Sequence, residues 1–171
     1  MGSNQGRTRE QLERAVDALA DLLEGLRLGP LYRSPPEDDR PAPPYLNTAV
    51  VGYSSLAPEA LLAALKRIEY RAGRRPAERH APRPLDLDLL LYGALSSDRP
   101  ELTLPHPRLR RRTFVLEPLA KLTPDWPVPP DGEPVVTLAR RAGHDSHLER
   151  LAWGDLGSLA DRGVTLPPGS R

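Results

Sequence analysis

Two aspartates separated by a single residue lie in an apolar run, and carboxylates at this spacing can hold a divalent cation. Asp86 and Asp88 alternate with leucines at the start of the run 85–92. A period of two predicts a strand that places both carboxylates on one face, about 7 Å apart, and the leucines on the other. Two such carboxylates, with coordination positions left for water and phosphate oxygens, are typical of magnesium sites. The same alternation is typical of a half-buried strand with a solvated acidic face, so the spacing alone leaves both interpretations open.

An arginine-rich segment comes directly before the aspartates. Arginines recur through residues 73–83 and include Arg74 and Arg83. The planar guanidinium group donates several hydrogen bonds at once and matches the geometry of a phosphate. A loop of this composition, folded over two metal-binding aspartates, would neutralise a polyphosphate. Together the two segments favour a site for a polyphosphate and Mg²⁺.

Further short motifs with polar and aromatic side chains are spread along the chain. They are Gly2-Ser3-Asn4, Tyr32-Arg33-Ser34-Pro35-Pro36, Tyr45-Leu46-Asn47, the segment 102–107 with Thr103 and His106, and the segment 112–119 with Arg112 and Phe114. In this order and at these separations, the motifs and the aspartate run resemble the 6-hydroxymethyl-7,8-dihydropterin pyrophosphokinase family of the folate pathway. The resemblance covers residues 2–132. It implies transfer of the β,γ-diphosphate of ATP, as a unit, to the primary hydroxyl group of the pterin, with release of AMP.

The resemblance also implies a role for each matching residue. Asp86 and Asp88 would bridge two Mg²⁺ ions on the phosphates of ATP. Arg74 and Arg83 would complete the catalytic group. The residues matched to ATP contacts are Lys66, Glu69, Arg74, Arg83, Thr103, His106 and Arg112. Those matched to the pterin pocket are Ser34, Pro35, Tyr45, Asn47, His80 and Phe114.

In that pocket, Tyr45 and Phe114 would stack on the two faces of the pterin ring, and Asn47 would pair with its amide-like edge. Taken without the resemblance, Phe114 is more typical of a core residue. Four positions depart from the family pattern: His80 stands where the family has a tryptophan, Pro76 takes the place of a second loop arginine, and Pro84 and Lys66 also differ. Histidine stacks more weakly than tryptophan, so we expect pterin affinity to suffer more than the chemistry.

The hydrophobic pattern predicts the elements that position these residues. Helices are expected over 8–24, 58–73 and 113–121, and strands over 26–34, 46–53 and 85–92. A capping box formed by Thr8 and Gln11 marks the start of the first helix. The proline-rich loop 35–44 and the arginine loop 74–83 are expected to be mobile covers of the site.

This order predicts an α+β fold of the ferredoxin-like βαββαβ type, an antiparallel sheet with its helices on one face. The resemblance places the first strand directly before Gly2, and only Met1 precedes that residue. We therefore expect the first strand to be missing from the chain and the native start to lie several residues upstream. The late segment 163–166 is the alternative occupant of the gap.

Composition and charge narrow the function classes. The chain has 171 residues, no cysteine and a net charge of +1, which excludes disulfide or thiolate chemistry and gives no overall field for nucleic acid or membranes. No apolar run approaches the roughly 20 residues of a membrane span, and no signal peptide is visible. We expect a cytoplasmic monomer. Its pyrophosphokinase domain would span 1–142, followed by a polar C-terminal tail over 143–171 that is a candidate for disorder.

Three other interpretations stay open. Another Mg²⁺-dependent, ATP-using transferase could employ Asp86, Asp88 and the arginines in the same way, although the pterin-pocket residues argue against it. A nucleic-acid-binding module is suggested by the basic run 108–112, but the balanced charge and the lack of paired aromatic residues on the strands disfavour it. A truncated copy that binds its substrates without turnover is the third.

Overall fold

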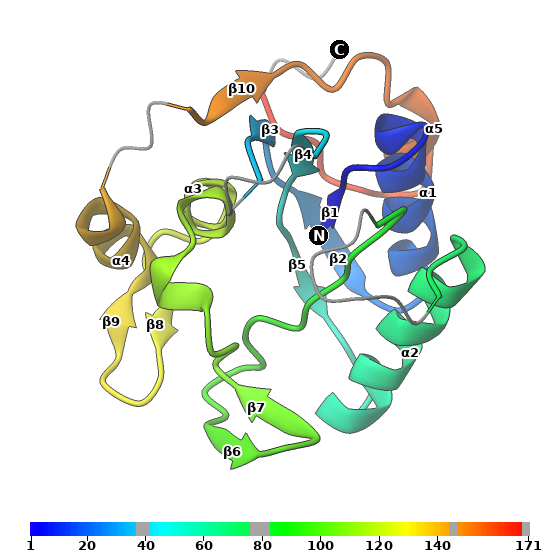
Figure 1. Cartoon of the computed structure of the whole chain (residues 1–171). Helices are drawn as coiled ribbons and strands as arrows, with labels where there is room; N and C mark the ends of the chain where they lie inside the picture. Colours follow the sequence, from blue (N-terminus) through cyan, green and yellow to red (C-terminus); the bar gives the residue numbers. More distant parts are fainter. Residues whose placement is uncertain (37–41, 76–82, 144–146, 169–171) are drawn as a thin grey trace.

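The computed structural model describes residues 1–36, 42–75, 83–143 and 147–168 (Figure 1). Its helices are α1 (Thr8–Ala20), α2 (Pro58–Arg71), α3 (Thr113–Leu122), α4 (Val135–Ala142) and α5 (Gly157–Asp161), with a 3-10 turn η1 (Leu109–Arg111). Its strands are β1 (Gly2–Ser3), β2 (Glu24–Leu28), β3 (Leu31–Ser34), β4 (Tyr45–Asn47), β5 (Val50–Tyr53), β6 (Ser97–Arg99), β7 (Leu102–Leu104), β8 (Pro127–Val128), β9 (Glu133–Pro134) and β10 (Glu149–Leu151). The central sheet has the order β1-β4-β3-β10, and β2 pairs with β5, β6 with β7 and β8 with β9, all antiparallel. This architecture confirms the predicted α+β class.

The two long strands predicted from the sequence are each divided by a short break. β2 and β3 are separated at Gly29-Pro30, and β4 and β5 at Thr48-Ala49. The breaks face each other, because the Gly29 N–H donates to the Ala49 carbonyl (2.9 Å) and the Thr48 hydroxyl donates to the Gly29 carbonyl (3.0 Å). Proline lacks an N–H and cannot continue the ladder, which explains the first break. The predicted strands are therefore confirmed in position.

β1 is an interior strand. Gly2 lies opposite Asn47 of β4 and, on its other edge, exchanges two backbone hydrogen bonds with Asp86 (2.9 and 2.8 Å). A Cβ atom on Gly2 would lie 2.6 Å from Asn47 Oδ1, so glycine is the residue that fits here. The chain thus has a two-residue strand at Gly2–Ser3 itself, between β4 and the aspartate segment, while the expected strand upstream of Gly2 stays a prediction.

The aspartate segment, residues 85–92, is not the strand that the alternation predicts. In the described residues it pairs with the sheet through one isolated bridge, from Asp86 to Gly2. The alternation of faces holds, because the first two leucines are buried and the two aspartates are partly exposed. The Leu87 N–H donates to the Glu69 carboxylate (2.6 Å). A side chain of α2 therefore replaces a neighbouring strand at this point.

The start of α1 also differs from the prediction. Arg7, not Thr8, is at the N-cap position, and no side chain of the described residues caps the helix. The predicted capping box is therefore wrong. The Gln11 amide instead lies 2.9 Å from the hydroxyl of Ser3 in β1, and this hydroxyl donates to the Pro84 carbonyl (2.5 Å). Gln11 thus connects α1 to β1 and to the residues just before the aspartates.

Helices lie on both sides of the sheet (Figure 1). α1 and α2 pack on one face. Their apolar residues are buried against those of β2, β3 and the aspartate segment, and together these residues form the main core. They provide the expected helical layer. α3 and α4 pack on the other side around Ala49 in a second apolar cluster, a layer that the βαββαβ pattern does not include. No helix in the described ranges has the length and apolar character that crossing a membrane requires.

The C-terminal segment is folded onto the sheet over residues 147–168. β10 pairs with β3, and Trp153, which is 2% exposed, donates its Nε1–H to the Gly29 carbonyl (2.9 Å). Thr165 then pairs with β2, so residues 163–166 lie beside β2 and do not take the place of a first strand. The expectation of a disordered polar tail is corrected for these residues, because a few apolar side chains without a regular period anchor them.

Candidate active site

One cavity of about 380 Å³ gathers most of the predicted site residues. It is bounded by β1, β3, β4, the aspartate segment, the residues before η1 and the start of α3. The predicted residues that line it are Ser34, Pro35, Tyr45, Asn47, Arg74, Arg83, Asp86, Asp88, His106, Arg112 and Phe114. Lys66, Glu69 and Thr103 do not line it. His80 and Pro76 lie outside the described residues.

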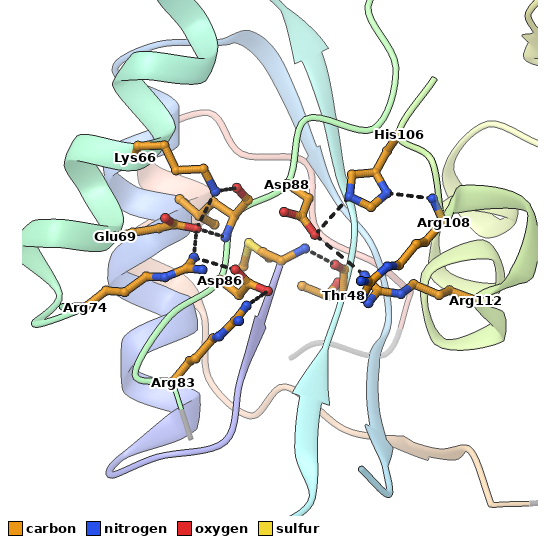
Figure 2. A network of polar contacts seen from close by, with 12 residues as sticks. Thr48, Lys66, Glu69, Arg74, Arg83, Asp86, Asp88, His106, Arg108 and Arg112 are labelled. Carbon is orange, nitrogen blue, oxygen red and sulfur yellow. Dashed lines mark hydrogen bonds and ion pairs between the residues drawn. The ribbon is translucent and has the colours of Figure 1, made fainter. Parts of the chain in front are cut away.

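Asp86 is held between two arginines at the acidic end of the cavity (Figure 2). The Arg74 guanidinium donates to Oδ1 (2.5 Å) and the Arg83 guanidinium to Oδ2 (3.2 Å). Burial alone would raise the pKa of Asp86, but Arg74 and Arg83 outweigh it and hold the pKa below its usual value. Asp86 is therefore an anion at neutral pH, and its position is fixed from both sides.

Asp88 faces the opposite wall of the cavity. Its Oδ2 lies 3.7 Å from His106 Nε2 and 3.8 Å from the Arg112 guanidinium. The Arg108 backbone N–H donates to His106 Nδ1 (3.2 Å), so the proton of the neutral imidazole is on Nε2 and points toward Asp88. Burial, helped by Arg112 and Arg108, lowers the pKa of His106 against the opposing charge of Asp88. His106 is therefore a neutral hydrogen-bond donor at neutral pH.

Glu69 supports the aspartate segment from behind (Figure 2). Its side chain is 3% exposed, and Oε1 accepts from the Leu87 N–H (2.6 Å), the Lys66 ammonium (2.9 Å) and the Arg74 guanidinium. Burial raises the pKa of Glu69, while these donors oppose the shift. The predicted direct contact of Glu69 with ATP is not supported by this position. A sequence signal for burial exists, since Glu69 follows Leu65 at helical spacing on the apolar face of α2.

Thr103 and Lys66 likewise point to structural partners. Thr103 is exposed on β7, and its hydroxyl donates to the Arg99 carbonyl within the β6-β7 hairpin (3.0 Å). Lys66 donates to the Leu87 carbonyl (3.0 Å) as well as to Glu69. The structure therefore does not bring these two predicted ATP contacts to the cavity wall.

The other end of the cavity combines aromatic and amide side chains. Tyr45 and Asn47 lie two residues apart on β4, and Phe114 lies in the first turn of α3. The buried Asn47 amide donates to the Ser34 hydroxyl (2.9 Å), which fixes its orientation. The Arg112 guanidinium lies 5.4 Å above the centre of the Phe114 ring. Arg112 therefore joins the acidic end to the aromatic end.

Asn4 belongs to the small polar motif Gly2-Ser3-Asn4, and the sequence alone predicts no role for its side chain. Its Oδ1 accepts the Arg83 N–H (2.8 Å), and its Nδ2 donates to the Pro43 carbonyl (3.4 Å). Asn4 thus joins the bases of the two predicted cover loops. Arg75, in contrast, stacks on Tyr70 (4.3 Å) and does not line the cavity, so in the structure it does not replace the arginine lost at Pro76. The central parts of both loops lie outside the described residues.

Two carboxylates framed by arginines, next to an aromatic and amide pocket, define an enzyme site for polyphosphate and a flat heterocycle. Residues 1–124 match the model of one family, and the chain belongs to that family, the 7,8-dihydro-6-hydroxymethylpterin-pyrophosphokinases. Two relatives are named 2-amino-4-hydroxy-6-hydroxymethyldihydropteridine pyrophosphokinase. The protein of Synechocystis sp. is 40% identical over 145 residues, 81% of this chain and 71% of its own length. That of Pseudomonas aeruginosa is 42% identical over 153 residues, 88% of this chain and 93% of its own length.

A third relative is a mitochondrial protein of Pisum sativum, named folate synthesis bifunctional protein. It is 36% identical over 158 residues, which are 92% of this chain and 30% of the pea protein. The similarity thus extends into a longer protein whose name refers to folate synthesis.

Proposed function

We propose that this protein transfers the diphosphate group of ATP to the hydroxymethyl group of 6-hydroxymethyl-7,8-dihydropterin, giving AMP and the pterin diphosphate for folate biosynthesis. The names of the family and of the relatives support this reaction. The observation that carries it is one shared cavity, in which a charged end suited to ATP meets an aromatic end suited to the pterin. We further propose that the protein is a monomer of the cytoplasm.

The pterin would bind at the aromatic end. Tyr45 and Phe114 offer apolar ring faces to a flat heterocycle, and stacked pairs contribute about 1 kcal/mol beyond burial. The Asn47 amide is oriented by its bond to Ser34, and its remaining hydrogen-bonding capacity is available to the amide-like edge of the pterin. Pro35, which also lines the cavity, and His80 complete the proposed pocket.

The donor set of the acidic end fits Mg²⁺. Asp86 and Asp88 line one cavity, and the described residues contain no cluster of three or more His, Cys, Asp or Glu that could hold a metal. Mg²⁺ usually binds one or two carboxylates together with water and phosphate oxygens, rather than a cage of protein ligands. Asp86 and Asp88 would therefore hold two Mg²⁺ ions. When bound, these ions would neutralise phosphate charge and lower the pKa of the attacking hydroxyl group.

The arginines and His106 would act on the phosphates. Diphosphoryl transfer needs little covalent chemistry from the protein, so positioning and charge neutralisation supply most of the rate. Arg74 and Arg83 lie beside Asp86 and would meet the transferred phosphates. Arg112 and the Nε2–H of His106, beside Asp88, would donate to the same polyphosphate from the opposite wall.

The test is AMP formation in the presence and absence of the pterin. With ATP, Mg²⁺ and 6-hydroxymethyl-7,8-dihydropterin, the protein should release AMP, and without the pterin it should not. Asp86→Asn and Asp88→Asn should each lower the rate more than about ten-fold, which corresponds to about 1.4 kcal/mol in the barrier. Asp98→Asn, in the exposed hairpin strand β6, is the matched control and should leave the rate unchanged. Pterin-independent AMP release would contradict the proposal.

A further inference from the structure

Four arginines line the cavity, and one of them has no partner for its side chain in the part of the chain that the structure describes. They are Arg74, Arg83, Arg108 and Arg112. Arg74 and Arg83 bond to Asp86, and Arg112 approaches Asp88. Within the described ranges, Arg108 forms its hydrogen bonds through backbone atoms alone: its N–H donates to His106 Nδ1, and its carbonyl accepts from the Arg111 N–H (3.2 Å). Its guanidinium group is thus the uncommitted cation of the cavity wall.

The backbone of Arg108 is nevertheless firmly placed. Its N–H donates to His106 Nδ1 (3.2 Å), and the Leu109 N–H donates to the His106 carbonyl (2.9 Å). The side chain of Leu109 is completely buried in the second apolar cluster. Figure 2 shows this N–H against His106, on the wall that faces Asp88. Arg108 therefore has a fixed base next to the acidic end and a long side chain that is free to meet a ligand.

The neighbouring arginines have other surroundings. Arg110 bonds to Asp131 and Glu133 on the β8-β9 hairpin. Arg111 is exposed, as Arg108 is, but it does not line the cavity. Of the four arginines in the basic run 108–112, one is therefore committed to structure, one lies away from the cavity and two line it. Sequence alone does not separate these roles.

We propose that Arg108 binds a phosphate group of ATP and is a further substrate-binding residue of this site. The proposal rests on the proposed function, in which the triphosphate is the anionic part of the two substrates and the pterin is uncharged. A guanidinium group without a carboxylate partner gains most from such an anion, because its planar fork forms two parallel charge-assisted hydrogen bonds. Arg108 would complete the opposite wall beside Arg112 and His106.

The substitution Arg108→Ala separates the side chain from the backbone role. Alanine keeps the N–H that bonds to His106, so the imidazole keeps its tautomer and position. We expect the dissociation constant for ATP, measured by calorimetry, to rise about ten-fold, the equivalent of one charge-assisted hydrogen bond of about 1.4 kcal/mol. Binding of adenosine, measured by competition, and of the pterin should stay unchanged. Arg108→Lys should recover part of the ATP affinity, because it restores the charge but not the fork.

Arg111→Ala is the matched control, since it removes an arginine from the same basic run but not from the cavity wall, and it should bind ATP like the wild type. The proposal is overturned if Arg108→Ala binds ATP as tightly as the control, or if adenosine or pterin affinity falls equally. A crystal structure of Arg108→Ala in which the His106 imidazole has moved would also overturn it, because the loss of ATP affinity would then come from His106. The proposed function is tested separately, by product formation with the wild type. If the wild type transfers diphosphate but Arg108→Ala binds ATP with wild-type affinity, only the role of Arg108 is refuted and the proposed function stands.

Discussion

Glu69 allows a direct test of how the aspartate segment is held. Its carboxylate receives the Leu87 N–H (2.6 Å), the Lys66 ammonium (2.9 Å) and the Arg74 guanidinium on one oxygen. Replacement by alanine leaves the buried Leu87 N–H without this acceptor and removes one of the two carboxylates that bond to Arg74. In the described residues, the aspartate segment pairs with the sheet through the isolated bridge at Asp86, so it depends on Glu69 for further support. We therefore predict that Glu69→Ala lowers the stability of the protein and displaces the two aspartates.

The size of the effect follows from these contacts. An unsatisfied buried N–H costs about 1 to 3 kcal/mol, and loss of one partner of a buried charge pair brings the total to about 3 to 5 kcal/mol. The Lys66 side chain is 45% exposed, so water replaces its lost contact and it adds little. Each kcal/mol lowers the Tm of a chain of this size by about 2 to 4 °C, so Glu69→Ala should lower Tm by roughly 6 to 20 °C in a calorimetric scan.

Two further variants sharpen this test. Glu69→Gln keeps an oxygen acceptor for the Leu87 N–H, so it should lower Tm less than alanine does. Glu59→Ala is the matched control on the same helix, since the Glu59 carboxylate is exposed and pairs with Arg99 at the surface; its Tm should stay near that of the wild type. Glu69→Ala should also need more Mg²⁺ for half of its maximal rate. The reasoning is refuted if Glu69→Ala melts within about 2 °C of the wild type.

Four other predictions follow from the structure. Gly2→Ala places a methyl group 2.6 Å from Asn47 Oδ1, so KM for the pterin should rise about ten-fold with little change for ATP; an equal rise for both substrates would contradict this. Trp153→Ala removes a side chain that is 2% exposed and bonds to Gly29, and should cost about 3 to 5 kcal/mol in urea unfolding; a loss under about 1 kcal/mol would mean that residues 147–168 add little stability. Burial lowers the pKa of His106 below 6.5 in the folded protein. Between that pKa and 6.5 the unfolded state binds more protons than the folded state, so the free energy of unfolding should fall as the pH drops through this range. His106→Gln should remove this pH dependence. Because Asp88 opposes the shift, Asp88→Asn should lower the pKa of His106 further in an NMR titration, and a higher pKa would argue against the contact.

The sequence predicts most of the elements because their apolar residues are periodic. The helices near 8–24, 58–73 and 113–121 and the strands near 26–34 and 46–53 appear at the expected places. The aspartate run shows where periodicity stops being sufficient. Alternation predicts which face each residue takes, and this is confirmed, but it does not report whether a neighbouring strand is present. Here the Glu69 carboxylate takes the Leu87 N–H instead.

The misassigned residues share a physical cause, since each bonds to a group outside its own helix, strand or segment. Gln11 has the type and spacing of a capping residue, yet its amide reaches Ser3 on β1. Trp153 stands in a segment without a regular apolar period, and its Nε1–H bonds to the Gly29 carbonyl at the break between β2 and β3. Thr103 belongs to a hairpin that directs it away from the cavity. Contacts of this kind leave no local pattern in the chain.

The sequence predicts the residues that line the cavity better than the residues that hold them in place. The residues that line it carry aromatic, amide, carboxylate and guanidinium groups in short motifs, whose chemistry can be assigned from residue type. Glu69 and Asn4 act on other protein groups, so residue type alone does not distinguish a supporting role from ligand contact. Arg108 belongs to a basic run, and only the fold shows that it lies on the cavity wall.

The central claim is that the two terminal phosphates of ATP move together to the pterin, and the mass of the pterin product tests it most directly. After incubation with ATP, Mg²⁺ and 6-hydroxymethyl-7,8-dihydropterin, mass spectrometry should show a pterin that carries a diphosphate, in amounts equal to the AMP released. A pterin carrying a single phosphate together with ADP, or free pyrophosphate with an unmodified pterin, would contradict the claim.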